Sequence, residues 1–500
     1  MKLTYCLRKF LSQHHVVRHI RKCGPSYGFG DESNRLENAK HIVVVEYSSP
    51  NIAKPFHMGH LRSTILGNFL ATLYERLGWN VIRLNYLGDW GTQFGVLAVA
   101  FKKYGDEEKL KENPLQHLFD IYVNINKEKS LGNKEIDKAA LEMFKRMESG
   151  DPEALSMWQR LKDISLQEYD KMYERLGVKF TEQHSESMYK DAGVSVIDRL
   201  KKEGLFKKDD MGKGYVEFKT GAKTIPVVVL KSDGTSLYIT REIAALMDRF
   251  ERYRFEKIHY VVENGQHLHF EHMYGVINTL PEYKDRLNAD LHVKFGRVEG
   301  MSTRQGNVVF LKDILDEARN RMTQTLKTKS TTRVGPGEIA GTAEELGRSA
   351  IFAQDLSQQR LKPYAFDWDR VLNFNQDSGV FLQYCHSRLC SIERMNSEVA
   401  ILEEMVLEDE HYSVQQAADL INHLQEFEQA VERSFSTLEP YVIVRYLYAL
   451  CHKVNAAYKV CRVKEAQDAK LQAYLQMFNA SRVVLSSGME LLGLRPLEKM

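Results

Sequence analysis

Cysteine is scarce in this chain, and its cysteines do not form paired motifs. The six cysteines among 500 residues include no CxxC spacing, which excludes a zinc knuckle or a disulfide framework and indicates reduced thiols in a protein that is not secreted. No apolar run approaches the length that crosses a bilayer, so we expect no membrane partner. The net charge is only +2, so nucleic acid could bind only through local basic patches. The length predicts two or three domains.

Acidic residues are absent from the first 30 positions, and the first one is Asp31. Six lysines and arginines occur in that stretch, and such an acid-poor, basic start resembles a mitochondrial transit segment, although serine is sparse. The alternative is a basic surface helix that remains from a larger N-terminal domain. Both interpretations stay open for residues 1–40, which we treat as a short segment of their own.

A strand, a turn and a helix follow one another around residue 50. The β-branched run at 42–45 is typical of a buried parallel strand, which we expect over about 42–48. Apolar residues at helical spacing from Leu61 to Leu77 then predict a helix that ends at Gly78. A second strand is predicted at 81–86. Such a βαβ unit is where α/β sheets bind nucleotides.

The turn between strand and helix contains His57 and His60, with the small Gly59 between them. Glycine lets a flat ring or a phosphate approach the backbone, and imidazoles can donate hydrogen bonds to phosphate oxygens as charge builds there. An HxxH pair alone also occurs in metal sites, helix caps and cores. The strand, the glycine and the helix favour a nucleotide-phosphate site, since a metal site would need a third ligand nearby.

The remaining chain divides by composition. Residues 102–205 are charged and helical in pattern, which predicts a helical insertion between the halves of a sheet, and strand patterns return at 224–230 and 258–262. The last hundred residues have few helix breakers and long apolar periodicity, which predicts an all-α domain. We therefore expect an α/β domain with a parallel sheet over 41–375 and a helical bundle over 376–500.

A second candidate phosphate site lies downstream, at residues 299–307. It is a glycine-bounded loop of small, hydroxylated and basic residues, which suits a mobile clamp on phosphates. Taken alone, the same composition is better explained as an ordinary surface turn.

Several long motifs together resemble the class I aminoacyl-tRNA synthetases and, within them, arginyl-tRNA synthetase of the mitochondrial and fungal branch. The motifs lie at residues 45–51, 54–64, 85–95, 233–241 and 439–440. The resemblance implies a Rossmann-like catalytic domain followed by an anticodon-binding bundle. It implies ligation of L-arginine to the 3′ end of tRNA(Arg) through arginyl-adenylate, with ATP and Mg²⁺. It further implies a monomer in the mitochondrial matrix, with the cytoplasm as the alternative location.

The resemblance also assigns residues to ATP. Lys54 occupies the position of a lysine that arginyl enzymes use in place of the lysines of the late loop, and it is expected to be catalytic together with His57 and His60. The residues implied in ATP binding are His57, Gly59, His60, Met301, Ser302 and Arg304.

The implied arginine pocket centres on Tyr238 and Glu242, which lie four apart at a helix start. A guanidinium needs a buried carboxylate and a flat partner, and the family generally has Asp where this chain has Glu242. The alternative is that Glu242 pairs with Arg241 or Arg249 on the same helix. The other residues implied in arginine binding are Glu46, Ser49, Pro50, Asn51, His60 and Gln266.

Two further features have competing interpretations. His267, His269 and His272 could face one ion, but the resemblance implies a helix start whose glutamine contacts substrate, so we expect no metal. The tail interleaves aromatics with cations, which suits stacking on anticodon bases or, for at least half of them, simple helix packing. The residues concerned are Tyr441, Arg445, Tyr446, Tyr448 and Tyr458.

The alternative function is a shortened, weakly active or non-catalytic tRNA-binding relative. Arginyl enzymes usually carry a sizeable N-terminal domain that grips the tRNA elbow, and only about 40 residues precede the first strand here. A nucleotidyltransferase that works without tRNA is a third hypothesis, which the long helical tail disfavours.

Overall fold

The computed structural model describes residues 12–232, 234, 237–288, 290–299, 310–329, 332–366, 377–399 and 407–500. The chain forms two compact units. We call the first the sheet unit (His41–Gly67 and Val81–Phe295) and the second the helical unit (Met1–Lys40, Asn68–Asn80 and Gly296–Met500). The predicted boundary at residue 375 lies outside the described residues, so the domain limits stay a prediction.

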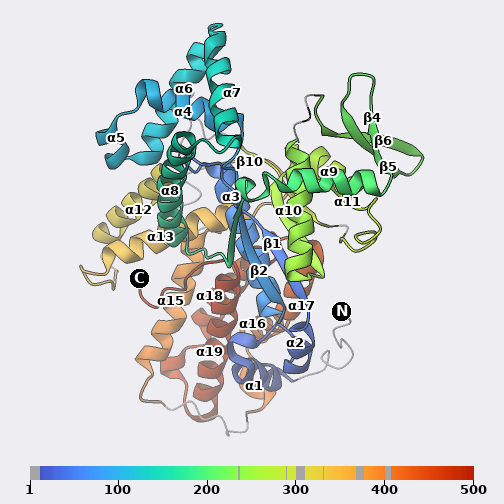
Figure 1. The fold of residues 1–500 in the computed structure, drawn as a ribbon. Helices are drawn as coiled ribbons and strands as arrows, with labels where there is room; N and C mark the ends of the chain where they lie inside the picture. The colour runs from blue at the N-terminus through green and yellow to red at the C-terminus, as the bar shows by residue number, and fades with distance from the viewer. Residues whose placement is uncertain are drawn as a thin grey trace. The chain divides into compact units, whose positions relative to one another are not determined.

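The sheet unit is built on a five-stranded sheet with the order β3-β2-β1-β7-β8 (Figure 1). Its strands are β1 (Ile42–Glu46), β2 (Asn80–Leu87), β3 (Glu182–Ser185), β7 (Lys257–Glu263) and β8 (His292–Phe295). The pairs β1–β7, β2–β3 and β7–β8 are parallel, and the predicted parallel-sheet fold is confirmed. Carboxyl ends of parallel strands meet at one edge of a sheet, which brings the segments after β1, β2 and β7 together.

Helix α3 (Met58–Arg76) follows the loop after β1, as predicted. The strand is two residues shorter than the predicted 42–48, because the chain turns into an irregular loop at Tyr47. Gly67 allows the close packing of helix and strand, since a Cβ there would lie 2.2 Å from the Tyr47 side chain. The βαβ unit therefore positions the loop at 47–57 at the sheet edge.

The region predicted as a helical insertion, 102–205, is only partly helical. Its helices are α4 (Thr92–Tyr104), α5 (Glu107–Glu112), α6 (Pro114–Ser130), α7 (Lys134–Glu148), α8 (Pro152–Leu176) and α9 (Ala192–Lys202). Strand β3 lies between α8 and α9 and extends the parallel sheet at its edge. Its four residues, Glu-Gln-His-Ser, lack the apolar pattern that would predict a strand.

A second, antiparallel sheet follows and consists of β4 (Phe206–Lys208), β5 (Gly214–Thr220) and β6 (Lys223–Leu230). The strand predicted at 224–230 is β6, and it belongs to this small sheet rather than to the parallel one. Figure 1 shows β4–β6 standing apart from the group of helices α4–α8. Helices α10 (Tyr238–Tyr253) and α11 (His267–Ile277) complete the sheet unit.

The helical unit contains the C-terminal bundle, which is all-α as predicted. The bundle helices are α15 (Gly379–Met395), α16 (Gln415–Gln425), α17 (Phe427–Thr437), α18 (Tyr441–Val460) and α19 (Asp468–Leu491). The other helices are α1 (Gln13–Cys23), α2 (Glu32–Asn38), α12 (Leu311–Thr328) and α13 (Ile339–Leu356), and a short ladder joins β9 (Val298–Glu299) to β10 (Tyr364–Ala365).

Two observations bear on the ends of this unit. Helix α1 buries Val16, Val17 and Ile20 and packs against α19, as a helix of the folded protein does.

In α18, Tyr446 and Tyr448 are buried and act in packing, whereas the Arg445 guanidinium covers the half-buried ring of Tyr441. Within the described residues, no helix combines the length and apolar character needed to span a bilayer.

Candidate active site

The loop after β1 has an unusual backbone conformation. Ser48, Ser49 and Ala53 have φ angles of 71°, 46° and 61°, in the left-handed region that residues with a side chain rarely occupy. Such strain persists only where surrounding contacts impose it, and it concentrates at functional sites. Here the Ser48 N–H donates to Ser63 Oγ (2.9 Å) and the Ser49 N–H donates to Asn85 Oδ1 (3.1 Å). Side chains of α3 and β2 thus hold the loop in place.

The two histidines of the turn lie stacked, with ring centroids 3.8 Å apart. The His57 N–H donates to His60 Nδ1 (3.3 Å), and the Gly59 N–H donates to His57 Nδ1 (3.0 Å). Because each Nδ1 accepts a hydrogen bond, a neutral ring carries its proton on Nε2. Burial lowers the pKa of His60 well below its usual value, and the neighbouring His57 and Lys54 lower it further. Both rings therefore present a neutral Nε2–H donor.

Lys54 lies in the same loop and is held by helix α8. The Tyr169 hydroxyl donates to the carbonyl oxygens of Asn51 (2.6 Å) and Lys54 (2.9 Å), and the Ala53 N–H donates to Ser165 Oγ (3.0 Å). Burial lowers the pKa of the Lys54 ammonium. A partly desolvated cation next to two N–H donors is an arrangement that stabilises a triphosphate.

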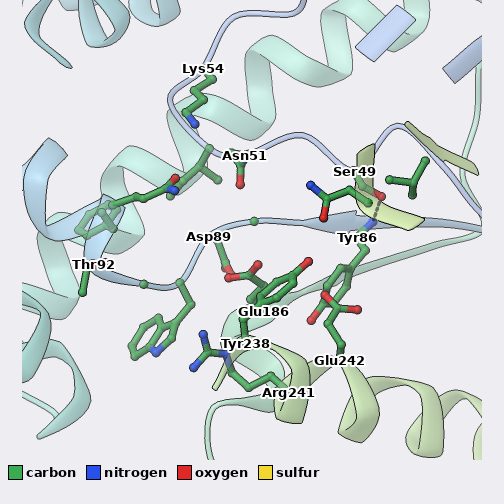
Figure 2. Close-up of a pocket in the computed structure, with 18 of the residues that line it drawn as sticks. Ser49, Asn51, Lys54, Tyr86, Asp89, Thr92, Glu186, Tyr238, Arg241 and Glu242 are labelled. Atoms are coloured by element: carbon green, nitrogen blue, oxygen red, sulfur yellow. Dashed lines mark hydrogen bonds between the residues drawn. The ribbon is translucent and has the colours of Figure 1, made fainter. Parts of the chain in front are cut away.

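A cavity of about 1050 Å³ opens beside this loop within the sheet unit (Figure 2). Ten of the residues predicted from the sequence line it: Glu46, Ser49, Asn51, Lys54, His57, Gly59, His60, Tyr238, Glu242 and Gln266. These residues come from two segments, 46–60 and 238–266, which are far apart in the sequence and which the fold brings to one pocket. In the view of Figure 2, Lys54 lies at the opposite end of the pocket from Glu242.

Four predicted site residues are not part of this arrangement. Pro50 is buried and does not line the cavity, because its carbonyl oxygen turns away to accept the Gly88 N–H (3.1 Å) in a bridge next to β2. The prediction that Pro50 binds arginine is therefore not supported by its position. Met301, Ser302 and Arg304 lie outside the described residues.

Glu46 forms a buried ion pair that the sequence did not indicate. The Arg249 guanidinium lies 2.5 Å from Glu46 Oε2, and both side chains are almost fully buried. Arg249 also donates to the Tyr260 hydroxyl (3.0 Å) and stacks over the Tyr86 ring. The alternative in which Arg249 pairs with Glu242 is not what the structure has, because the Arg249 guanidinium is paired with Glu46.

Two carboxyl groups lie at the inner end of the cavity: Glu242, which is buried, and Glu186, which is half-buried. Burial, reinforced by the charge of Glu46, raises the pKa of Glu242 to about 8. Burial also raises the pKa of Glu186 to about 7, although Arg241 opposes the rise. The Tyr238 hydroxyl donates to Glu242, and the charge of Glu242 and burial hold the pKa of Tyr238 well above its usual value. For both carboxyl groups the effect of burial thus outweighs that of the nearby arginine, Arg249 for Glu242 and Arg241 for Glu186.

Sequence reasoning missed Glu186. It lies in a single helical turn, Glu186–Tyr189, directly after β3, in a region predicted to be an insertion of helices. Recognition of β3 as a parallel strand would have identified Glu186, because ligands bind at the carboxyl ends of parallel strands.

Full ionisation would leave the charges around the inner end unbalanced, and in the free protein retained protons offset the difference. The carboxylates Glu46, Glu186 and Glu242 face the guanidinium groups of Arg241 and Arg249, which leaves one negative charge when all are ionised. A bound monocation neutralises it. Tyr86 and Tyr238 provide flat walls, which suit a planar guanidinium better than a compact ammonium.

A metal ion would need a cluster of ligating side chains near the cavity. Across the ranges the structure describes, no cluster of three or more His, Cys, Asp or Glu side chains could hold an ion. His269 lines the cavity, and burial together with His272 lowers its pKa to about 4.

Comparison with known proteins gives the site its family. The model for the catalytic domain of class I (R) tRNA synthetases matches residues 30–368, and the model for the DALR anticodon binding domain matches residues 382–500. The chain belongs to the arginyl-tRNA synthetase family. The catalytic-domain match covers more than half of the chain. The residues that line the pocket, from Glu46 to Phe295, all lie within it. The catalytic domain of this family uses ATP as a co-substrate.

Named relatives agree with this assignment. The chain is 42% identical to the probable mitochondrial arginine–tRNA ligase of Mus musculus, over all of this chain and 85% of the relative. It is also 42% identical to the cytoplasmic arginine–tRNA ligase of Saccharomyces cerevisiae, over 93% of this chain and 77% of the relative. The arginyl-tRNA synthetase structure of Plasmodium falciparum superposes with a TM-score of 0.79 at 27% identity, covering 98% of this chain and 83% of that one.

Proposed function

We propose that this protein ligates L-arginine to the 3′ end of tRNA(Arg) through arginyl-adenylate, in mitochondrial translation. The observation that carries the proposal is the set of two carboxyl groups with raised pKa values, Glu186 and Glu242, in the same cavity as Lys54 and two Nε2–H donors. One end of the cavity suits a guanidinium and the other suits a triphosphate. Nothing among the relatives supports the alternative of a non-catalytic tRNA-binding protein.

Arginine enters with its guanidinium at the acidic end. Glu242 and Glu186 release their protons as the guanidinium binds, because the new cation removes the electrostatic reason for holding them. Lysine brings the same charge but no planar fork, and citrulline brings the shape without the charge. A site that leaves buried polar groups unpaired with the wrong ligand discriminates by about 10⁴–10⁵. We assign the α-amino group to Glu46 and Asn51, with Gln266 as a further contact, and all three residues line the cavity.

ATP occupies the end formed by Lys54, His57 and His60. The N-terminus of α3, at Met58, adds its positive end to the same place. An oxygen of the arginine carboxylate forms a bond with the α-phosphorus, and the bond to pyrophosphate breaks. The imidazole Nε2–H groups and the Lys54 ammonium stabilise the negative charge that develops on the phosphate oxygens. A terminal hydroxyl of the tRNA then attacks the arginyl carbonyl, and AMP leaves.

Mg²⁺ belongs to this proposal as a companion of the substrate. The described residues offer no acidic cluster that would hold the ion without ATP, and Mg²⁺ is commonly bound through substrate phosphates. We assign no residue to it. Met301, Ser302 and Arg304 are proposed as further phosphate contacts from the late loop.

The remaining proposals concern organisation and location. We place the catalytic domain at 41–375 and the anticodon-binding domain at 376–500, in a monomer of the mitochondrial matrix. The mitochondrial names of several relatives support the location, while the similarity to the cytoplasmic yeast enzyme keeps the cytoplasm as the alternative.

One charging assay tests the function. The purified full chain is incubated with ATP, Mg²⁺, tRNA(Arg) and radiolabelled arginine, with labelled lysine and citrulline as controls. We expect acid-precipitable label when the labelled amino acid is arginine and none when it is lysine or citrulline. Binding of tRNA without charging would instead identify a non-catalytic relative, and adenylyl transfer without tRNA would identify a nucleotidyltransferase.

A further inference from the structure

One face of helix α8 contacts both ends of the active site. Five of its side chains, spaced three or four positions apart, hydrogen-bond the loops after β1 and β2: Trp158, Lys162, Ser165, Tyr169 and Tyr173. This spacing places them along one stripe of the helix. None of the five lines the cavity. They contact the residues that hold the substrates rather than the substrates.

Lys162 makes the most buried charged contact on this stripe. Its ammonium nitrogen lies 2.6 Å from Asp89 Oδ2, and the Asp89 side chain has no exposed surface. Asp89 follows β2 and lines the cavity at its acidic end (Figure 2). The same ammonium donates to Ser185 Oγ (3.2 Å) and Ser187 Oγ (3.4 Å). Lys162 therefore joins the end of β2 to the end of β3.

Glu186 lies between those two serines. Asp89 accepts the Ser187 N–H at Oδ1 (2.9 Å) and the Ser187 hydroxyl at Oδ2 (2.7 Å). The neighbouring Trp90 N–H hydrogen-bonds the Glu186 carboxylate itself. The turn that carries Glu186 is thus held at Ser187 by the Asp89 carboxylate and at both serines by the Lys162 ammonium, which also binds Asp89.

We propose that Lys162 is a positioning residue for arginine recognition, which acts through Asp89 on the turn that holds Glu186 against the guanidinium. The inference rests on the proposed function. It assigns to the helical insertion a part in amino-acid selection, although Lys162 itself does not reach the cavity. Removal of the ammonium releases Ser185, takes one contact from Ser187 and leaves Asp89, which still binds Ser187, as an uncompensated buried charge.

The expected effect is specific to one substrate. Misplacement of a binding group by about an ångström costs up to about a hundredfold, so Lys162→Met should raise the KM for arginine by about 10- to 100-fold. The KM for ATP should stay within about twofold, because the loop carrying Lys54 is held by Ser165 and Tyr169 instead.

The pH profile gives a second signature. Glu186 faces Asp89, Arg241, Tyr238 and Glu242, and the charge of Asp89 raises its pKa. Without the Lys162 ammonium that charge acts unopposed. The pH above which the arginine KM levels off should therefore move upward in Lys162→Met. A merely structural contact would leave it unchanged.

The experiment compares steady-state charging by the wild type, Lys162→Met, and the control Lys171→Met. Lys171 lies on the same helix and makes an exposed pair with Glu168, so its loss should leave both KM values unchanged. Wild-type charging is measured first, because its absence would refute the proposed function rather than the role of Lys162. Parallel rises of the arginine and ATP KM values in Lys162→Met would overturn the inference.

A double variant separates positioning from stability. Replacement of a buried ion pair by apolar residues is often tolerated, so Lys162→Met with Asp89→Leu should recover thermal stability lost in Lys162→Met. The arginine KM should stay high, because the double variant lacks both the ammonium and the carboxylate that hold the turn at Ser185 and Ser187. A return of the arginine KM to the wild-type value together with stability would show that the pair is only structural.

Discussion

Glu242→Gln should abolish arginine charging and yet make the protein more stable. The carboxyl group is buried, the nearby Arg249 is paired with Glu46, and the pKa of Glu242 is about 8 against an unperturbed value of 4.5. Glutamine keeps the shape and removes the ionisation. The substitution therefore separates what the residue does for function from what its burial costs the fold.

The size of the effect follows from proton linkage. Because the folded-state pKa is raised, the cost of burial is absent below pH 4.5, grows as the pH rises, and levels off above about pH 8. Between pH 4.5 and 7 the cost grows by about 1.4 kcal/mol per pH unit, which gives on the order of 3 kcal/mol at pH 7. For a unit of this size that corresponds to a rise in Tm of about 6–12 °C.

Differential scanning calorimetry at pH 5, 7 and 8.5 tests the prediction. Glu242→Gln should gain stability over the wild type as the pH rises, whereas Glu112→Gln on an exposed helix should match the wild type throughout. Millimolar arginine should raise the Tm of the wild type and leave Glu242→Gln unchanged. A Tm difference that does not depend on pH would refute the reasoning, since packing rather than ionisation would then explain it.

Two further predictions concern the substrates. Lys54→Met should lower the single-turnover rate of adenylate formation by about 10²–10³ while the arginine Kd, measured by calorimetry, stays unchanged, because Lys54 belongs to the phosphate end of the cavity; an equal loss of arginine affinity would contradict this assignment. Arginine affinity should rise between pH 6.5 and 8.5 as Glu186 and Glu242, with pKa values of about 7 and 8, lose their protons. Binding at pH 7 should release protons, seen as a dependence of the binding enthalpy on the buffer, and an enthalpy independent of the buffer would rule the coupling out.

The spacing of apolar residues along the sequence was enough to predict β1 and α3. The β-branched run at 42–45 and the helical spacing after His60 are strong signals, and β1 and α3 form where they predict. Tyr238 and Glu242 lie in the first turns of α10, where a spacing of four places two side chains on the same face of a helix. These elements place the phosphate end of the site at the edge of the sheet, while contacts from α8 set the shape of its loop.

The acidic end could not be derived in the same way. Strand β3 is short and polar, and it forms because β2 offers an unpaired edge rather than because its residues favour extension. The position of Glu186 depends on β3, so a sequence analysis that does not predict this strand does not predict the residue either. The pairing of Arg249 with Glu46 rather than with Glu242 is likewise a matter of tertiary packing, since all three groups lie within reach of one another.

The left-handed residues Ser48, Ser49 and Ala53 have a consequence for how the site could be built or lost. Their conformation is disfavoured in an isolated peptide, so the shape of the nucleotide loop is imposed by contacts from elsewhere in the chain. Ser48 and Ala53 hydrogen-bond side chains of α8, the same helix whose lysine grips the end of β2. Fraying of that helix would disable adenylation and arginine selection together, which makes the two capacities a single cooperative property of the fold.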